Sequence, residues 1–156
     1  QSEASLRKEI EELNLKIYRG IDANINRGKE GLRVLEDIFR FIITDNTSRK
    51  KIRLIRHDID AMLRDKELIK QRLTARDSTG DPGKKVDSCE LTREDIPDLV
   101  FANIQRVKES LRVIEELLKI VAVENIVHAK KARYAVYCLE KYIYLKHFHI
   151  KGRQKK

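Results

Sequence analysis

The chain has 156 residues, enough for one domain with a single core, and its 41% hydrophobic content predicts that it folds. A net charge of +9 favours an anionic partner, whether nucleic acid, a membrane surface or a phosphorylated metabolite, without choosing among them. Nothing resembles a signal peptide or an apolar run that could span a bilayer, and Cys89 and Cys138 lie far apart, so we expect a reducing, cytoplasmic setting.

Apolar residues recur at helical spacing almost throughout, and no stretch shows the sustained alternation of a half-buried strand. We therefore expect an all-α fold, a helical bundle of two hairpins related by a pseudo-twofold axis plus an N-terminal helix. The expected helices cover residues 5–19, 21–43, 48–72, 98–123 and 125–148. Asp22, Thr47 and Asp95 are the expected caps of helix starts, because their side-chain oxygens can accept from free backbone N–H groups.

The expected domain organisation is one helical domain over residues 1–150, with an internal repeat at about 21–72 and 98–149. A basic tail over residues 151–156 follows and supplies four of the positive charges. The first residue is Gln1 rather than Met, which suggests a trimmed chain or a domain cut from a longer polypeptide.

The repeat is the most informative pattern in the sequence. The fifteen residues 23–37 return 79 positions later as residues 102–116, and ten of the fifteen are identical, several of them polar. A repeat kept only for packing could let its polar positions drift. A duplicated site is therefore the sharper interpretation.

Two polar residues of each copy fall inside the apolar stripe when about 100° is allotted to each residue. They are Asn24 and Arg27 in the first copy and Asn103 and Arg106 in the second. A buried arginine needs a partner, because an uncompensated buried charge costs several kcal/mol. We expect the two arginines to meet near one cleft.

Two further arginines, Arg56 and Arg133, occupy similar shoulders of apolar stripes on the expected partner helices. The pattern predicts that four cations and two amides converge. Such a set could bind an anionic ligand.

Ordinary packing offers an alternative for each of these residues. Arg27 could pair with Glu36 or Glu115 on a neighbouring helix, and the asparagines could tie helix to helix. Gly28 and Gly31 could make room for a ligand, or they could allow two helices to cross closely.

Residues 76–85 look like a functional loop between the two halves of the repeat. They contain two glycines, three cations and the carboxylates Asp77 and Asp81, a mixture that suits a phosphate and its Mg²⁺. The segment is not a P-loop, because the Gly-x-x-x-x-Gly-Lys-[Ser/Thr] pattern is absent and no strand precedes it. An ordinary polar turn is the alternative.

The repeated Ala-Asn-x-x-Arg-x-x-Glu-x-Leu-Arg-Val-x-Glu motif, the Arg56-His57 pair and the Ala-Arg-Asp-Ser-x-Gly-Asp loop at 75–81 occur together in this order. In this combination the chain resembles the helical module often found N-terminal to thiamine phosphate synthase, described as an alternative hydroxymethylpyrimidine phosphate kinase. The resemblance covers roughly residues 21–145. It implies phosphoryl transfer from ATP to hydroxymethylpyrimidine phosphate with Mg²⁺, and a thiamine phosphate synthase domain or protein as a partner.

On this hypothesis the site is shared by both copies and the loop. Catalysis is expected from Arg27 and Arg106, substrate and phosphate binding from Asn24, Asn103, Arg56, Arg76 and Ser78, Mg²⁺ binding from Asp77 and Asp81, and orientation of these groups or metal binding from Glu36 and Glu115. A non-catalytic ligand-binding or regulatory module associated with the synthase is the alternative. Nucleic-acid binding is disfavoured, because no recognised motif is present and much of the charge lies in the tail.

Overall fold

The computed structural model describes residues 1–85 and 92–149. The described part is all-α, as predicted, and contains no strand. Its α-helices are α1 (Glu3–Asp37), α2 (Asn46–Met62), α3 (Lys66–Ala75), α4 (Ile96–Val121) and α5 (Ile126–Ile143). Short π-helical turns follow α1 (Ile38–Ile42) and α5 (Tyr144–Phe148), and 3₁₀ turns occupy Pro82–Lys84 and Val123–Asn125. None of the described helices is long and apolar enough to cross a membrane. The predicted basic tail, residues 151–156, lies outside the described residues.

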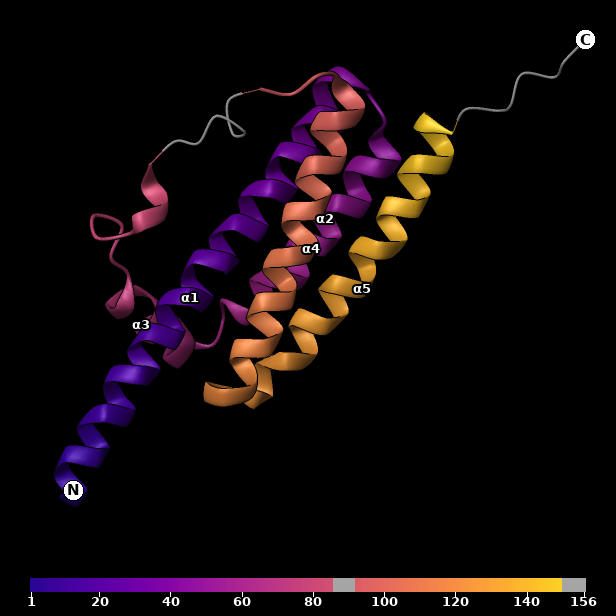
Figure 1. The fold of residues 1–156 in the computed structure, drawn as a ribbon. Helices are drawn as coiled ribbons and strands as arrows, with labels where there is room; N and C mark the ends of the chain where they lie inside the picture. The colour runs from indigo at the N-terminus through magenta and orange to yellow at the C-terminus, as the bar shows by residue number, and fades with distance from the viewer. Residues whose placement is uncertain (86–91, 150–156) are drawn as a thin grey trace, which may run out of the picture.

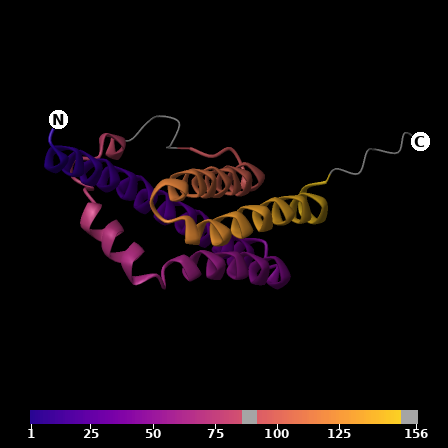
Figure 2. The same cartoon turned by 90° about the horizontal axis from the view of Figure 1, so that it is seen from below.

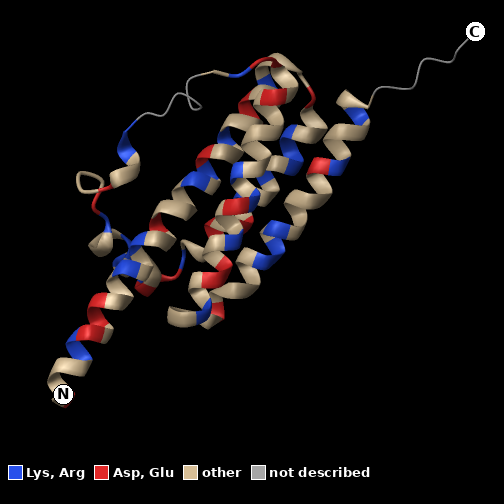
Figure 3. Ribbon diagram, in the orientation of Figure 1, with Lys and Arg blue, Asp and Glu red and all other residues tan. Residues whose placement is uncertain are grey.

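Helices α1, α2, α4 and α5 form a four-helix bundle, with α3 packed on the outside of α1 (Figure 1). Helix α1 runs antiparallel to α4, and this pair forms the most extensive interface of the bundle. Viewed from below, α2 and α5 lie together on one side of that pair (Figure 2). Charged positions are interleaved along the helices rather than gathered on one face (Figure 3).

The first two expected helices are one continuous helix. The predicted break at Gly20 does not occur, because this glycine packs against α4: a Cβ placed on it would lie 3.0 Å from Leu117 Cδ1. Asp22 is therefore not a cap but a buried residue inside α1. The N-terminal half of α1 extends beyond the end of α4 (Figure 1).

Aspartates cap the N-termini of α2, α3 and α4. The backbone N–H groups of Thr47 and Ser48 donate to Asp45, so the cap of α2 lies two residues before the predicted Thr47. Asp65 caps α3, which divides the single helix expected over residues 48–72. The prediction of Asp95 as the cap of α4 is confirmed, since its side chain accepts from Asp98 N–H.

Glycines determine how closely α1 approaches α4. A Cβ on Gly31 would lie 2.9 Å from Val107 Cγ2, whereas a Cβ on Gly28 would lie 3.8 Å from Ser110 Cβ and 3.9 Å from Ile59 Cδ1. Close helix crossing, one of the two predicted uses of these glycines, is observed at Gly31, whereas Gly28 has ordinary contact distances. The pseudo-twofold relation of the hairpins stays a prediction, although Gly28 and Gly31 occupy the positions in the first copy that Val107 and Ser110 occupy in the second.

Candidate functional site

The two asparagines of the repeat lie along the line where α1 meets α4, which we call the seam. Asn24 and Asn103 are 8% and 5% exposed, as the helical wheel predicts. Each amide donates to the carbonyl four residues earlier, Asn24 to Gly20 at 2.8 Å and Asn103 to Leu99 at 2.9 Å. Each carboxamide is therefore held in the same way in both copies.

The two arginines of the repeat are exposed, and the prediction that they are buried is wrong. Gly28 faces Ile59 of α2 and marks the core side of the seam. From there Gly31 lies about 60° around α1 and Arg27 about 100° in the same direction, at the outer edge. Arg106 has the equivalent position on α4. Neither Arg27 nor Arg106 forms an ion pair or a side-chain hydrogen bond with another residue in the described part of the chain.

The predicted partner Glu36 is committed elsewhere in the first hairpin. It is 5% exposed, and Arg56 of α2 donates from Nε to its Oε2 at 3.1 Å, while Arg56 Nη2 lies 3.1 Å from the same oxygen. Arg33 approaches the same carboxylate at 3.8 Å from the solvent side. Arg56 therefore joins α1 to α2 and does not reach the α1/α4 seam.

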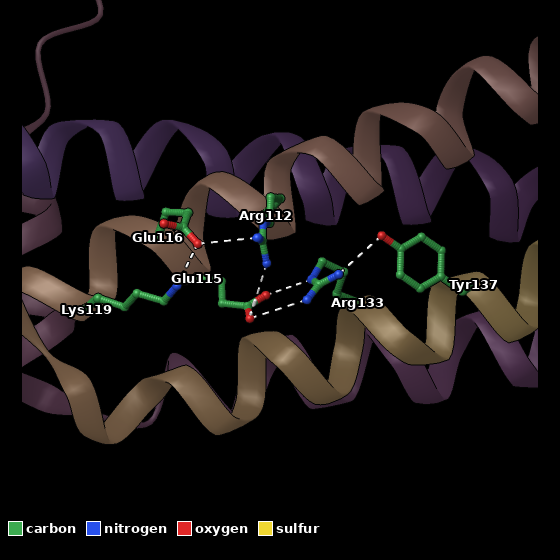
Figure 4. A network of polar contacts seen from close by, with 6 residues as sticks. All are labelled: Arg112, Glu115, Glu116, Lys119, Arg133 and Tyr137. Atoms are coloured by element: carbon green, nitrogen blue, oxygen red, sulfur yellow. Dashed lines mark hydrogen bonds and ion pairs between the residues drawn. The ribbon is translucent and has the colours of Figure 1, made fainter.

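A matching network joins α4 to α5 in the second hairpin (Figure 4). Arg133 Nε donates to Glu115 Oε2 at 2.6 Å, and its Nη1 donates to the Tyr137 hydroxyl at 3.2 Å. These hydrogen bonds raise the pKa of the Arg133 guanidinium above its ordinary value, and the bond to Glu115 has a larger effect than the bond to Tyr137. Arg112 and Glu116 continue the network toward solvent.

These two networks lie toward opposite ends of the bundle. Gly31 of α1 faces Val107 of α4 across the seam. Glu36 lies five residues after Gly31, and Glu115 lies eight residues after Val107. Since α1 and α4 are antiparallel, the two carboxylates are roughly 20 Å apart along the bundle. The predicted convergence of all four arginines at one cleft is therefore wrong, and Glu36 and Glu115 cannot share one metal ion.

The loop after α3 is attached to α1 through Asp22. Arg76 forms a bidentate pair with this carboxylate, with Nε 2.7 Å from Oδ2 and Nη2 2.8 Å from Oδ1, and Arg72 Nη2 lies 3.1 Å from Oδ1. Asp22 is 3% exposed and Arg72 is 6% exposed. Burial lowers the pKa of Arg72, which Asp22 partly offsets, and the bonds to Asp22 raise the pKa of Arg76.

The rest of the loop is held by hydrogen bonds between its own residues. Gly80 N–H donates to Asp77 Oδ1 and Gly83 N–H donates to Asp81 Oδ1, both at 2.8 Å. Lys84 Nζ donates to the Thr79 carbonyl at 3.0 Å. Within residues 1–85 and 92–149 there is no group of three or more His, Cys, Asp or Glu side chains that could hold a metal ion. A metal at Asp77 or Asp81 would therefore need oxygen ligands from substrate or water.

Three positions escaped the sequence analysis: Arg19, Asp22 and Arg72. An aspartate inside a helical pattern, together with Arg72 and Arg76 spaced four apart on a later helix, was the available signal. The sequence instead predicts Asp22 as a helix cap, because a short side-chain oxygen suits that position. The remaining predicted position, Ser78, lies on the exposed surface of the loop.

The fold and these contacts define an all-α protein in which both copies of the helix motif lie along a helix seam, with their asparagines buried and Arg27 and Arg106 exposed. A family model described as the ThiD2 family matches residues 19–142, and the chain belongs to this family. No solved structure matches the fold.

Similar curated proteins carry the name thiamine-phosphate synthase. The protein from Nostoc sp. is 36% identical over 87% of this chain and 37% of its own length. Those from Rhodopirellula baltica and Gloeobacter violaceus are 32% and 35% identical, over 90% and 80% of this chain and 37% and 35% of their own lengths. The chain thus spans little more than a third of the relatives it matches.

Proposed function

We propose that this protein acts in thiamine synthesis and transfers a phosphoryl group from ATP to hydroxymethylpyrimidine phosphate. Membership of the ThiD2 family and the similarity to proteins named thiamine-phosphate synthase support the pathway. The observation that carries the reaction is the exposed seam, where both copies of the motif present an arginine beside a fixed asparagine.

The seam suits ligands with phosphate groups. Arg27 and Arg106 are exposed and pair with no described carboxylate, so their guanidinium groups are available for bidentate bonds to phosphate oxygens. Asn24 and Asn103 lie beside them, each carboxamide held in place by its own helix, and present oxygen atoms for an amino group or N–H groups for a phosphate. The seam also differs from the hairpin networks, where every arginine already has a carboxylate partner.

The reaction requires little acid-base chemistry from the protein. The acceptor is a phosphate monoester with a second pKa near 6, so it is largely ionised at neutral pH and needs no strong general base. Catalysis then depends on placing the two phosphates in line and on neutralising their charge. Bound Mg²⁺ would supply part of that neutralisation, and the loop carboxylates Asp77, which is exposed, and Asp81, which is half-buried, are the candidates to hold it.

Arg56 and Arg76 do not belong to the seam. Each is bonded to a carboxylate of α1, Glu36 or Asp22. Arg56 therefore supports the hairpin, and Arg76 is anchored at the start of the loop.

The test is ADP release by the purified chain with ATP, Mg²⁺ and hydroxymethylpyrimidine phosphate. We expect Arg27→Ala and Arg106→Ala each to lower kcat/KM by at least about tenfold, because each removes a charge-assisted phosphate contact worth roughly 1.5–3 kcal/mol. Arg33→Ala and Arg112→Ala are matched controls, since these equivalent arginines on the same helices are also exposed but pair with nearby carboxylates. They should stay within about twofold of the parent chain.

Two results would overturn the proposal. One is turnover that survives in both seam variants at the level of the controls, with the helical content unchanged. The other is tight binding of hydroxymethylpyrimidine phosphate without ADP release, which would favour the ligand-binding or regulatory module instead.

A further inference from the structure

The place where the loop joins α1 has more positive than negative charge. Asp22 is the shared carboxylate for Arg72 and Arg76, so one negative charge faces two guanidinium groups. Arg72 is buried, and burial makes its charged form less favourable, as its lowered pKa indicates. An excess of positive charge next to a low-dielectric interior attracts an anion more strongly than the same charge in open solvent.

A third arginine holds the loop from the other side. Arg19 Nη2 donates to the Asp77 backbone carbonyl at 3.1 Å and lies 3.7 Å from Asp77 Oδ2. The Asp77 side chain is also bonded to Gly80 N–H, which turns it toward the loop itself. The side chains of Arg19 and Arg76 are 40% and 42% exposed. Both therefore reach solvent although Arg19 is bonded to Asp77 and Arg76 to Asp22.

The residues whose contacts hold the loop carry more positive than negative charge. The cations among them are Arg19, Arg72, Arg76 and Lys84, and the carboxylates are Asp22, Asp77 and Asp81. Figure 3 shows basic positions where α3 and the loop run beside α1.

The loop also offers neutral donors next to these arginines. Ser78 and Thr79 are exposed, and in the described part of the chain neither backbone N–H donates a hydrogen bond. Backbone N–H groups and guanidinium groups together are the donors that phosphate oxygens prefer.

We propose that Arg19, Arg76 and the loop residues Ser78 and Thr79 form a binding site for a phosphate or diphosphate group. Asp22 and Arg72 do not touch the ligand and hold Arg76 in position. Arg19 lies eight residues before Arg27 on α1, roughly 12 Å along the helix, so this site is separate from the seam. Its role as the second phosphate subsite of a phosphoryl transfer rests on the proposed function, whereas anion binding itself does not.

The test is calorimetric titration of the full chain with inorganic pyrophosphate at low ionic strength. We expect Arg19→Ala to weaken binding at least fivefold, because it removes one of the two solvent-reaching guanidinium groups. The matched control is Arg33→Ala, which removes an exposed arginine from the same helix and should leave the affinity unchanged. Arg27→Ala/Arg106→Ala should retain pyrophosphate binding at the loop.

Three outcomes would overturn the site: no pyrophosphate binding by the parent chain, equal affinity of Arg19→Ala and the parent, or loss of binding in the seam double variant alone. The last would leave the proposed function intact and place the anion at the seam. Conversely, loss in Arg19→Ala without any ADP release by the parent would support the loop site and contradict the kinase. Circular dichroism of each variant checks that the helices remain.

Discussion

The two hairpins carry the same ion pair in different surroundings. In the first, Arg56 lies 3.1 Å from Glu36 and its side chain is 22% exposed. In the second, Arg133 lies 2.6 Å from Glu115, its side chain is 10% exposed, and Tyr137 adds a hydrogen bond. The Arg–Glu pair is present in both hairpins, but its surroundings differ. This difference shows that polar residues present in both copies of the motif can serve packing. We propose a ligand for the arginines of the motif that stay exposed at the seam, Arg27 and Arg106.

The largest effect is expected when the buried carboxylates of the two pairs, Glu115 and Glu36, are removed one at a time. Glu115→Ala strands a buried guanidinium and should cost about 3–5 kcal/mol in free energy of unfolding. Glu36→Ala should cost only about 1–2 kcal/mol, because Arg56 can turn toward water. Urea denaturation of the two variants measures both losses.

A double variant separates pairing from packing in the second hairpin. Glu115→Leu/Arg133→Leu should recover most of the stability lost in Glu115→Ala, since apolar residues replace both charges. Equal losses for Glu115→Ala and Glu36→Ala would show that the two hairpins do not differ in the way their exposures indicate.

The seam provides a second comparison, between two glycines three residues apart. Gly31→Ala should cost about 1–3 kcal/mol, because its Cβ would lie 2.9 Å from Val107 Cγ2 and force α1 away from α4. Gly28→Ala should be neutral or stabilising by up to about 1 kcal/mol, since its Cβ would make ordinary contacts and alanine favours helix. Thermal denaturation distinguishes them, and similar melting temperatures for the two variants would contradict close crossing at Gly31.

The sequence predicts the helical class and the inward position of the asparagines, because both follow from local periodicity. It misplaces the arginines, since a side chain about 40° farther round a helix can pass from buried to exposed. It also misses the Asp22 contacts, because they join residues about fifty positions apart. Such pairings depend on how the helices pack, which periodicity does not encode.

The smallest expected effect concerns the turns that connect the helices within each hairpin, between α1 and α2 and between α4 and α5. Asp45 lies in the turn between α1 and α2. It forms an ion pair with Lys146 and lies 2.8 Å from His147 Nε2, and both partners belong to the π-helical turn that follows α5. Burial opposes ionisation of Asp45, but the hydrogen bonds from Lys146, Ser48 and His147 outweigh it and hold its pKa well below the ordinary 3.8. The stabilisation is therefore complete above about pH 4 and is lost as the pH falls further.

Asp45→Asn keeps a residue that can cap α2 but removes the charge, so the variant isolates the ionic contribution. We expect a loss of about 1 kcal/mol at pH 7, shrinking as the pH falls below 4, because the parent carboxylate then takes up a proton as well. Glu124→Gln is the control, since this exposed carboxylate has the equivalent position in the second turn. A difference between Asp45→Asn and the parent that stays constant from pH 7 to pH 3 would mean that the charge of Asp45 does not join the two hairpins.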